Sequence, residues 1–402
     1  MLHIKPIISS LLRSKSGPIL LLLQITLSVA IVANASFIIH ERLTMMQRDS
    51  GYAEEQIFKF NVYNFDPAID NLEQNKVDQQ ILRSLPYVID ASSTNMMPLS
   101  GGGWSDIYND GPDAETAKQT PSFAFYLGSD HLLNTMGAKL IAGRSFRPEE
   151  MNTSLDDSGM LAMVSQPFAK AFWGDESPIG KVVYQGTNPI EIIGVIEKLQ
   201  GAWVNSDNFE YSVIQNIDFS GQSANKTYMV RALPEHIADL EAVIVKALHA
   251  DNPNRVIDDF TSLTELKDRT YSNHRLMATV LSMMVVLLLL ITALGLTGMV
   301  MFNIQRRTKQ IGTRRALGAK KRDIVSYFMV ENYLICIAGG IIGGLLALQL
   351  GQQLMTLYSL PMLPSVYPFA AVVGLLLVTT FAVIVPAARA ARISPAMATR
   401  SV

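Results

Sequence analysis

The sequence predicts a membrane protein with four transmembrane α-helices and a large α+β periplasmic domain inserted between helices 1 and 2. Hydrophobic residues make up 49% of the 402 residues and charged residues only 17%, whereas soluble domains carry about 25% charged residues. The hydrophobic residues are concentrated in long uncharged runs. The block between the first two runs exceeds 200 residues and contains the strand and helix patterns of a folded domain.

Four runs are long enough to cross a bilayer, which takes about 20 apolar residues. Prolines between the last two runs separate them, because proline interrupts a helix. The first run resembles a signal peptide but is longer than the apolar core of one, so we predict that it is retained. The single cysteine, Cys336, excludes a disulfide framework. The predicted transmembrane helices are residues 18–39, 276–304, 324–355 and 369–388.

The distribution of charge predicts the topology. Three Lys and Arg residues and no acids precede residue 18, the connector 305–323 holds eight cations, and three arginines follow residue 388. By the positive-inside rule, both termini and the connector face the cytoplasm. The block 40–275 then lies outside with 19 of the 33 Lys and Arg and 33 of the 35 Asp and Glu residues. We therefore expect a multi-pass membrane protein with both termini in the cytoplasm.

The block 40–275 mixes strand and helix patterns. "QIFKFNVYNF", "EIIGVIE" and "KTYMVRAL" read as strands, and "NLEQNKVDQQILRSLP" and "PEHIADLEAVIVKALHAD" as helices. Two lobes are expected, with residues 121–199 as the inserted lobe. "SLTELKDRTYSNHRLMATVLSMMV" contains no glycine or proline, so we predict one continuous stalk helix that enters the second transmembrane helix.

No catalytic residues, cofactor site or metal site is predicted on this chain. "GDESPIGKV" lacks the glycine spacing and the hydroxyl residue of a phosphate-binding loop. The six histidines have no zinc spacing. Asp130 and His131 are interpreted as the polar start of a helix.

Two further segments indicate contacts with the membrane. Residues 1–17 place apolar side chains on one helical face beside cations, which predicts a helix along the cytoplasmic membrane surface; residues 389–402 form a cytoplasmic tail. The third transmembrane helix carries small residues at the spacing that lets membrane helices approach closely. These candidate helix-packing residues are Gly339, Gly340, Gly343 and Gly344. The partner helix could belong to this chain or to another copy.

The connector resembles the cytoplasmic region after the second span in FtsX-like ABC permeases. "RTKQIGTRRALGAKKRDIVSYFMVEN" is similar to the family pattern R-T-x-E-I-G-x-x-x-A-x-G-A-x-x-x-D-I, which is followed by an acid, here Glu331. It departs at Gln310, where the family usually has Glu. "AGRSF", "AKAFWGDESPIGKVV" and "IEIIGVIE" resemble the MacB-type periplasmic domain, and "PAARAARISPAMATR" resembles the family's ending.

This resemblance implies a permease subunit without catalytic residues. It would couple a separate ATPase, which binds ATP and Mg²⁺, to the outer domain by mechanotransmission, since no Walker motif occurs in the sequence. A short connector helix with Ile311, Leu317 and Ile324 apolar and a cationic opposite face would dock on the ATPase. The candidate ATPase-coupling residues are Arg307, Thr308, Gln310, Ile311, Gly312, Arg314, Arg315, Leu317, Gly318 and Asp323.

The family also implies partners and a cargo. The expected partners are a cytoplasmic ABC ATPase dimer, a second copy or a related permease, and a periplasmic adaptor with an outer-membrane duct; no nucleic acid is expected. Efflux of peptides, toxins or antibiotics is the first hypothesis. Release of lipoproteins, and a regulator or peptide sensor that transports nothing, stay open as alternatives.

Overall fold

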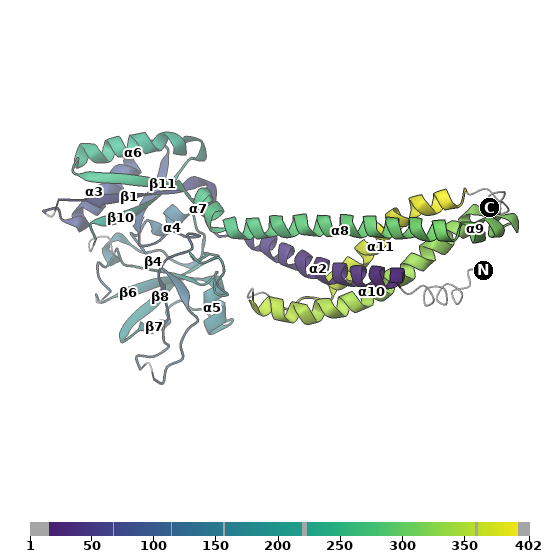
Figure 1. The fold of residues 1–402 in the computed structure, drawn as a ribbon. Helices are drawn as coiled ribbons and strands as arrows, with labels where there is room; N and C mark the ends of the chain where they lie inside the picture. The colour runs from purple at the N-terminus through teal and green to yellow at the C-terminus, as the bar shows by residue number, and fades with distance from the viewer. Residues whose placement is uncertain are drawn as a thin grey trace. The chain divides into compact units, whose positions relative to one another are not determined.

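The computed structural model describes residues 16–392 apart from 67, 114, 156, 219–222 and 358–360. The predicted membrane-surface helix, except for its last two residues, and residues 393–402 of the tail lie outside the described residues. The chain divides into two compact units. The helical unit is formed by the segments that end at Met46 and begin at Asn273, and the mixed unit spans Gln47–Ser272. In Figure 1 the strands belong to the mixed unit.

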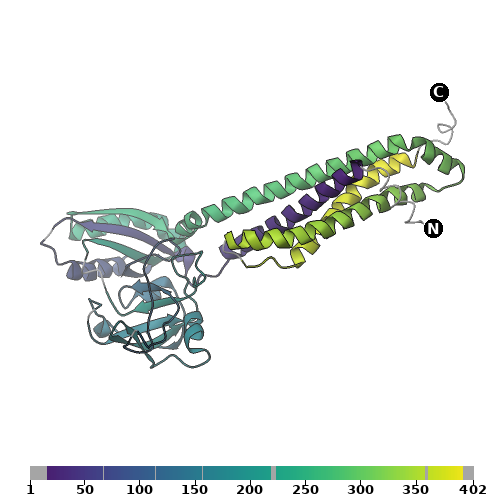
Figure 2. The same ribbon diagram turned by 60° about the horizontal axis from the view of Figure 1, so that its bottom comes forward.

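Four long helices make up the helical unit, and each is long and apolar enough to cross a membrane. Figures 1 and 2 show α2, α10 and α11 side by side. All four helices extend beyond the predicted spans, because their polar ends continue the helical hydrogen bonding. The predicted fold class is confirmed. The helices are α2 Ser16–Met46, α8 Ser272–Arg306, α10 Lys321–Leu357 and α11 Val366–Ala390, with the short α9 Thr308–Ala316 between α8 and α10.

The glycines of α10 lie against two helices of the same chain. A Cβ atom added to Gly343 would lie 2.5 Å from the carbonyl oxygen of Thr26 in α2, and one added to Gly339 would lie 2.9 Å from Ile25. The alternate pair faces α11, where a Cβ on Gly340 would lie 2.9 Å from Val372. A Cβ on Gly344 would meet Pro368 of α11 at an ordinary 3.7 Å. Glycine thus permits the approach of backbones that small residues give in membranes.

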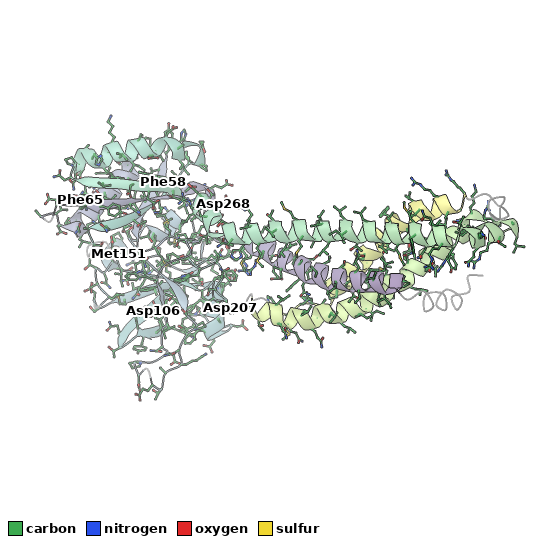
Figure 3. All side chains as sticks on the ribbon, in the orientation of Figure 1. Phe58, Phe65, Asp106, Met151, Asp207 and Asp268 are labelled. Carbon is green, nitrogen blue, oxygen red and sulfur yellow. The ribbon has the colours of Figure 1, made fainter. Side chains whose placement is uncertain are left out.

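Helix α2 is the most enclosed of the four. Its most apolar stretch is 56% buried, whereas that of α8 is only 11% buried, so α8 presents apolar side chains outward along its length (Figure 3). Polar side chains of α2 bind its neighbours: Asn34 donates to the carbonyl of Ala347 at 3.1 Å, and the hydroxyls of Ser28 and Thr292 lie 2.9 Å apart. In an apolar medium such bonds satisfy groups that water cannot reach.

The mixed unit contains two sheets. The first is antiparallel with strand order β11-β1-β10-β2, and the second has seven strands in the order β3-β4-β9-β6-β8-β5, with β7 paired to β8. Because the second sheet begins at Ser105 and ends at Gln215, it is longer than the predicted inserted lobe 121–199. The strands are β1 Ile57–Asn64, β2 Val88–Thr94, β3 Ser105–Asp106, β4 Phe123–Leu127, β5 Leu140–Gly143, β6 Met160–Ser165, β7 Val182–Gln185, β8 Asn188–Ile196, β9 Ser212–Gln215, β10 Asn225–Ala232 and β11 Arg255–Ser262.

Each sheet has its own apolar core. Phe58, Phe60 and Tyr228 of the first sheet pack with apolar residues of α3 and α6. Phe123 and Phe125 of the second pack with residues of α5. These cores support the description of two lobes. The helices of this unit are α3 Asn71–Ser84, α4 Leu132–Met136, α5 Gln166–Trp173, α6 Ile237–Asp251 and α7 Leu263–Thr270.

The predicted continuous stalk helix is wrong. Helix α7 ends at Thr270, and Tyr271 has φ −86° and ψ 2°, which interrupts the helix before α8 begins at Ser272. The Tyr271 side chain is buried in the mixed unit, where Gln200 donates to its hydroxyl at 3.3 Å. A tertiary contact thus overrides a sequence that contains no helix breaker.

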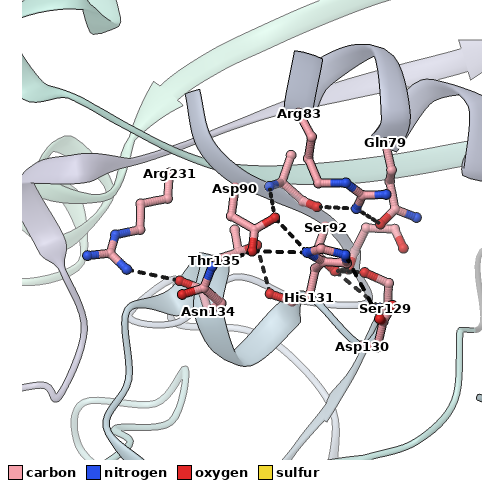
Figure 4. A network of polar contacts seen from close by, with 12 residues as sticks. Gln79, Arg83, Asp90, Ser92, Ser129, Asp130, His131, Asn134, Thr135 and Arg231 are labelled. Carbon is pink, nitrogen blue, oxygen red and sulfur yellow. Dashed lines mark hydrogen bonds and ion pairs between the residues drawn. The ribbon is translucent and has the colours of Figure 1, made fainter. Parts of the chain in front are cut away.

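His131 joins the two sheets rather than only starting a helix. It immediately precedes α4, which lies in sequence between β4 and β5 of the second sheet. Its Nδ1 lies 2.8 Å from a carboxylate oxygen of Asp90 in β2 of the first sheet, and Asn134 donates to the other oxygen at 2.5 Å (Figure 4). The hydroxyls of Ser92 and Ser129 lie 2.9 Å apart beside this pair.

Both groups of this pair have shifted pKa values. The hydrogen bond to Asp90 raises the pKa of His131 above its ordinary 6.5. Burial alone would raise the pKa of Asp90, but hydrogen bonds from His131 and Asn134 outweigh it and lower that pKa below 3.8. The nearby Arg83 opposes protonation of His131 and Asp130 favours it. Charged His131 and ionised Asp90 therefore stabilise each other.

This pair predicts a stability that depends on pH. The raised pKa of His131 means that its contribution is complete below about pH 6.5 and is lost as pH rises through the folded-state pKa, and the lowered pKa of Asp90 means that its contribution is lost in acid. His131→Gln should therefore flatten the fall in melting temperature of the full chain between about pH 6 and pH 9. His236→Gln, at a half-buried ring stacked on Tyr87, is the control. An unchanged profile in His131→Gln would contradict the prediction.

A second prediction concerns the packing of α10. Gly343→Ala should destabilise the helical unit by about 1–3 kcal/mol, because the added Cβ would press on the backbone of α2. Thermal unfolding in detergent measures the effect. Gly298→Ala in α8 is the matched control, since a Cβ there meets no atom within 4 Å. Equal melting temperatures for the two variants would refute the close contact.

Candidate functional site: the connector between α8 and α10

Helix α9 is a separate short helix whose ends are well defined. Its C-terminal end is closed by Gly318 with φ +93°, a conformation that favours glycine. The amide of Gly318 donates to the carbonyl of Arg315 at 3.2 Å, and that of Ala319 donates to Arg314 at 3.0 Å. This pair of bonds is the Schellman arrangement that satisfies the last carbonyls of a helix. Gly318 therefore fixes the turn between α9 and α10.

One face of α9 is buried against the ends of the long helices. Ile311 is 5% exposed and packs in a cluster with Ile324 and Phe328 of α10 and Val383 of α11. Gly312 is also buried. Leu317, which the sequence predicted on the same apolar face, is instead 83% exposed. It is the residue at which α9 ends, so it does not follow the helical spacing of Ile311.

Arg307 attaches the start of α9 to α10. Its guanidinium donates to the Tyr327 hydroxyl at 3.1 Å and to the Glu331 carboxylate at 3.2 Å. The Glu331 side chain is only 3% exposed. A buried carboxylate needs a cation and hydrogen bonds to offset its lost hydration. Arg307 therefore offsets the charge of the buried Glu331 carboxylate, and this ion pair holds the start of α9 against α10.

Several predicted coupling residues act on the backbone of the connector. Thr308 donates to the carbonyl of Ile304 at 3.0 Å and Arg315 donates to Ala319 at 2.8 Å. Asp323 accepts from the amide of Lys320 at 2.9 Å, at the first turn of α10. These three residues shape the turns at either end of α9.

The outward face of the connector is cationic. The guanidinium of Arg314 lies 5.0 Å from the centre of the Tyr327 ring, a cation–π distance. A small cavity of about 60 Å³ lies between α9 and the start of α10, with Gln310, Arg314 and Asp323 in its lining. Gln310 and Arg314 are exposed, so both can meet another surface. The exposed cations are Arg306, Lys309, Arg314, Lys320, Lys321 and Arg322.

The predicted site residues thus fall into three groups. Gln310, Arg314 and Leu317 are exposed, Ile311 and Gly312 are buried, and the others hold the helix ends. Sequence reasoning did not name Tyr327, which contacts two arginines, because only the fold brings it beside them. No group of three or more His, Cys, Asp or Glu side chains able to hold a metal lies within the described residues.

Comparisons with known proteins identify the family of this part of the chain. Residues 282–395, which include α9 and the arginine–glutamate pair, match the family described as FtsX-like permease C-terminal. The predicted resemblance to FtsX-like permeases is confirmed for these residues. The match begins inside α8 and ends just beyond α11, so it covers three of the four membrane helices.

MacB proteins are among the relatives that this chain resembles. It is 26% identical over 229 residues to the macrolide export ATP-binding/permease protein MacB of Vibrio parahaemolyticus, which covers 56% of this chain and 34% of that protein. It is 25% identical over 218 residues to the uncharacterized ABC transporter permease YknZ of Bacillus subtilis, 54% of each chain. The chain therefore spans about a third to a half of the length of these curated relatives.

A solved structure is similar to part of this chain. The periplasmic region of MacB from Actinobacillus actinomycetemcomitans is 16% identical, and the match covers 56% of this chain and 97% of that one with a TM-score of 0.34.

The buried ion pair gives a third prediction. Arg307→Met should destabilise the helical unit by about 3–5 kcal/mol, because it leaves the Glu331 carboxylate buried without its cation. The double variant Arg307→Met with Glu331→Gln should recover much of that loss. Thermal unfolding of the three proteins tests this, and a double variant less stable than Arg307→Met would contradict it.

Proposed function

We propose that this protein is the permease subunit of an ATP-driven ABC transporter. The observation that carries the proposal is the geometry of α9, which is fixed on one side by Ile311 and Arg307 and cationic on the other. A rigid, charged helix between two membrane helices is suited to receive force from a soluble partner. The FtsX-like family match supports the same assignment.

The proposed partner is a separate cytoplasmic ABC ATPase with an acidic docking groove. The cations of the connector complement such a groove, and opposite charges across an interface direct association. ATP and Mg²⁺ would bind to the ATPase. The connector and both termini would then lie in the cytoplasm of a bacterial cell and the mixed unit in the periplasm, which agrees with the positive-inside rule.

The proposed activity is mechanotransmission to the periplasmic domain, in a dimer with a second copy or a related permease. The MacB relatives are named for macrolide export, so efflux of antibiotics, peptides or toxins is the proposed transport, with a periplasmic adaptor and an outer-membrane duct as further partners. The alternatives, lipoprotein release and a regulatory role without transport, would use the same connector and differ only in what the mixed unit acts on.

Partner identification is the first test. The tagged chain, extracted in mild detergent, should bring down a soluble ATPase in stoichiometric amount, as judged by mass spectrometry. A periplasmic adaptor in the same sample supports efflux. Recovery of the chain with a hydrolase or kinase and no ATPase would overturn the transporter assignment.

A charge reversal provides the fourth prediction. Arg314→Glu should weaken binding of the ATPase by about tenfold or more, because it places like charges at the docking surface. Lys170→Glu makes the same change at an exposed position of α5, away from the connector, and should leave binding unchanged. Titration of the purified ATPase onto each variant measures the affinity. Equal affinities of the Arg314→Glu and Lys170→Glu variants for the ATPase would contradict the assignment of α9 to the docking surface.

A further inference from the structure

Two further connectors, distinct from the connector between α8 and α10, lead from the mixed unit to membrane helices. Residues 47–56 follow α2 and continue into β1, and residues 263–271 continue from β11 and precede α8. Strands β1 and β11 are paired neighbours in the first sheet. The connectors are also bound to each other, since Lys267 donates to both carboxylate oxygens of Glu54 at 2.8 Å. Both connectors are therefore attached to the first sheet at neighbouring strands and are held together by the Glu54–Lys267 ion pair.

A buried hydrogen-bond network links the same connectors to the second sheet. Gln200 donates from its backbone amide to the carbonyl of Ser50 at 2.9 Å and from its side chain to the Tyr271 hydroxyl at 3.3 Å. The hydroxyls of Tyr52 and Tyr126 both reach the Gln200 carbonyl, and they lie 3.0 Å from each other. We call Tyr52, Tyr126, Gln200 and Tyr271 the Gln200 hub.

The hub contains residues from both connectors and from the second sheet. Tyr52 lies on the first connector and Tyr271 on the second. Tyr126 is part of β4, and Gln200 lies between β8 and β9. Gln200 and Tyr271 are each 1% exposed and Tyr126 is fully buried. Water therefore does not compete for these bonds, and a bond in such surroundings is stronger than one at the surface.

The protonation of the tyrosines keeps the hub intact. Burial raises the pKa of Tyr52, with a further rise from Tyr126, and burial also raises the pKa of Tyr126. Both hydroxyls therefore keep their protons at physiological pH.

We propose that Gln200 is a positioning residue that ties both connectors to the second sheet, so that a displacement of either connector moves both sheets of the mixed unit. This inference rests on the proposed function, because the ATPase supplies the displacement. Hydrogen-bond networks and packed side chains are the physical means by which such a displacement travels. The hub therefore adds a buried tie to the second sheet to the attachment that both connectors have to the first sheet through β1 and β11.

The test compares hydrogen exchange in the complex of the full chain and its ATPase, with and without ATP. In the wild type, ATP should change exchange in the first sheet and in β4 and residues 198–202 of the second. Gln200→Met and Tyr271→Phe each break the bond between the Gln200 side chain and Tyr271 and leave the backbone bonds of Gln200 in place. Each should therefore keep ATP hydrolysis and the change in the first sheet, and reduce the change in β4. Tyr271→Phe removes one oxygen atom, so it is the variant least prone to misfold.

A matched control is Tyr108→Phe, which also removes a buried hydroxyl, one that lies 3.5 Å from Gln215 and outside the hub. It should keep the ATP-dependent change in β4. An undiminished change in β4 in both Gln200→Met and Tyr271→Phe would overturn the role of Gln200 and leave the proposed function standing. A wild-type complex with no ATP-dependent change in residues 47–272 would overturn both.

Discussion

The close contact of α10 with α2 and α11 is the constraint on which the helical unit depends. Lipid offers the helices no hydrophobic incentive to associate, so association requires backbones near enough for dispersion forces and hydrogen bonds. Gly339 and Gly343 give that distance on one side of α10 and Gly340 gives it on the other. The ends of α10 and α11 then form the surface on which Ile311 packs. The position of the connector is thus a consequence of helix packing in the membrane part.

The mixed unit is organised differently from the helical unit, since its two sheets have separate apolar cores. Polar contacts join the sheets: the Asp90–His131 pair on one side and the Gln200 hub beside the connectors. Polar contacts are directional, and buried ones are costly to leave unmade, so they fix how the two sheets meet without a shared apolar core.

The sequence predicts the periodic features well. Runs such as residues 369–388 identify membrane helices because composition alone decides whether a segment is stable in lipid. The spacing of Gly339 and Gly343 indicated a contact surface, but only the structure shows that the partners are α2 and α11. The break at Tyr271 and the contacts of Arg307 with Tyr327 depend on residues far apart in sequence. Local propensity contains no information about such contacts, so the sequence predicts a continuous stalk helix where the structure has a break at the buried Tyr271.

The strand order of the first sheet has a consequence for biosynthesis. Strands β1 and β11 are neighbours although about 190 residues separate them in the chain. This sheet cannot close until nearly the whole block between α2 and α8 has emerged from the ribosome, whereas the strands of the second sheet lie within residues 105–215 and can pair earlier. The nascent chain must therefore carry an unpaired β1 strand for most of the synthesis of the domain. An unpaired strand edge promotes aggregation, and folding of the second sheet meanwhile shortens the distance that β1 and β11 must bridge.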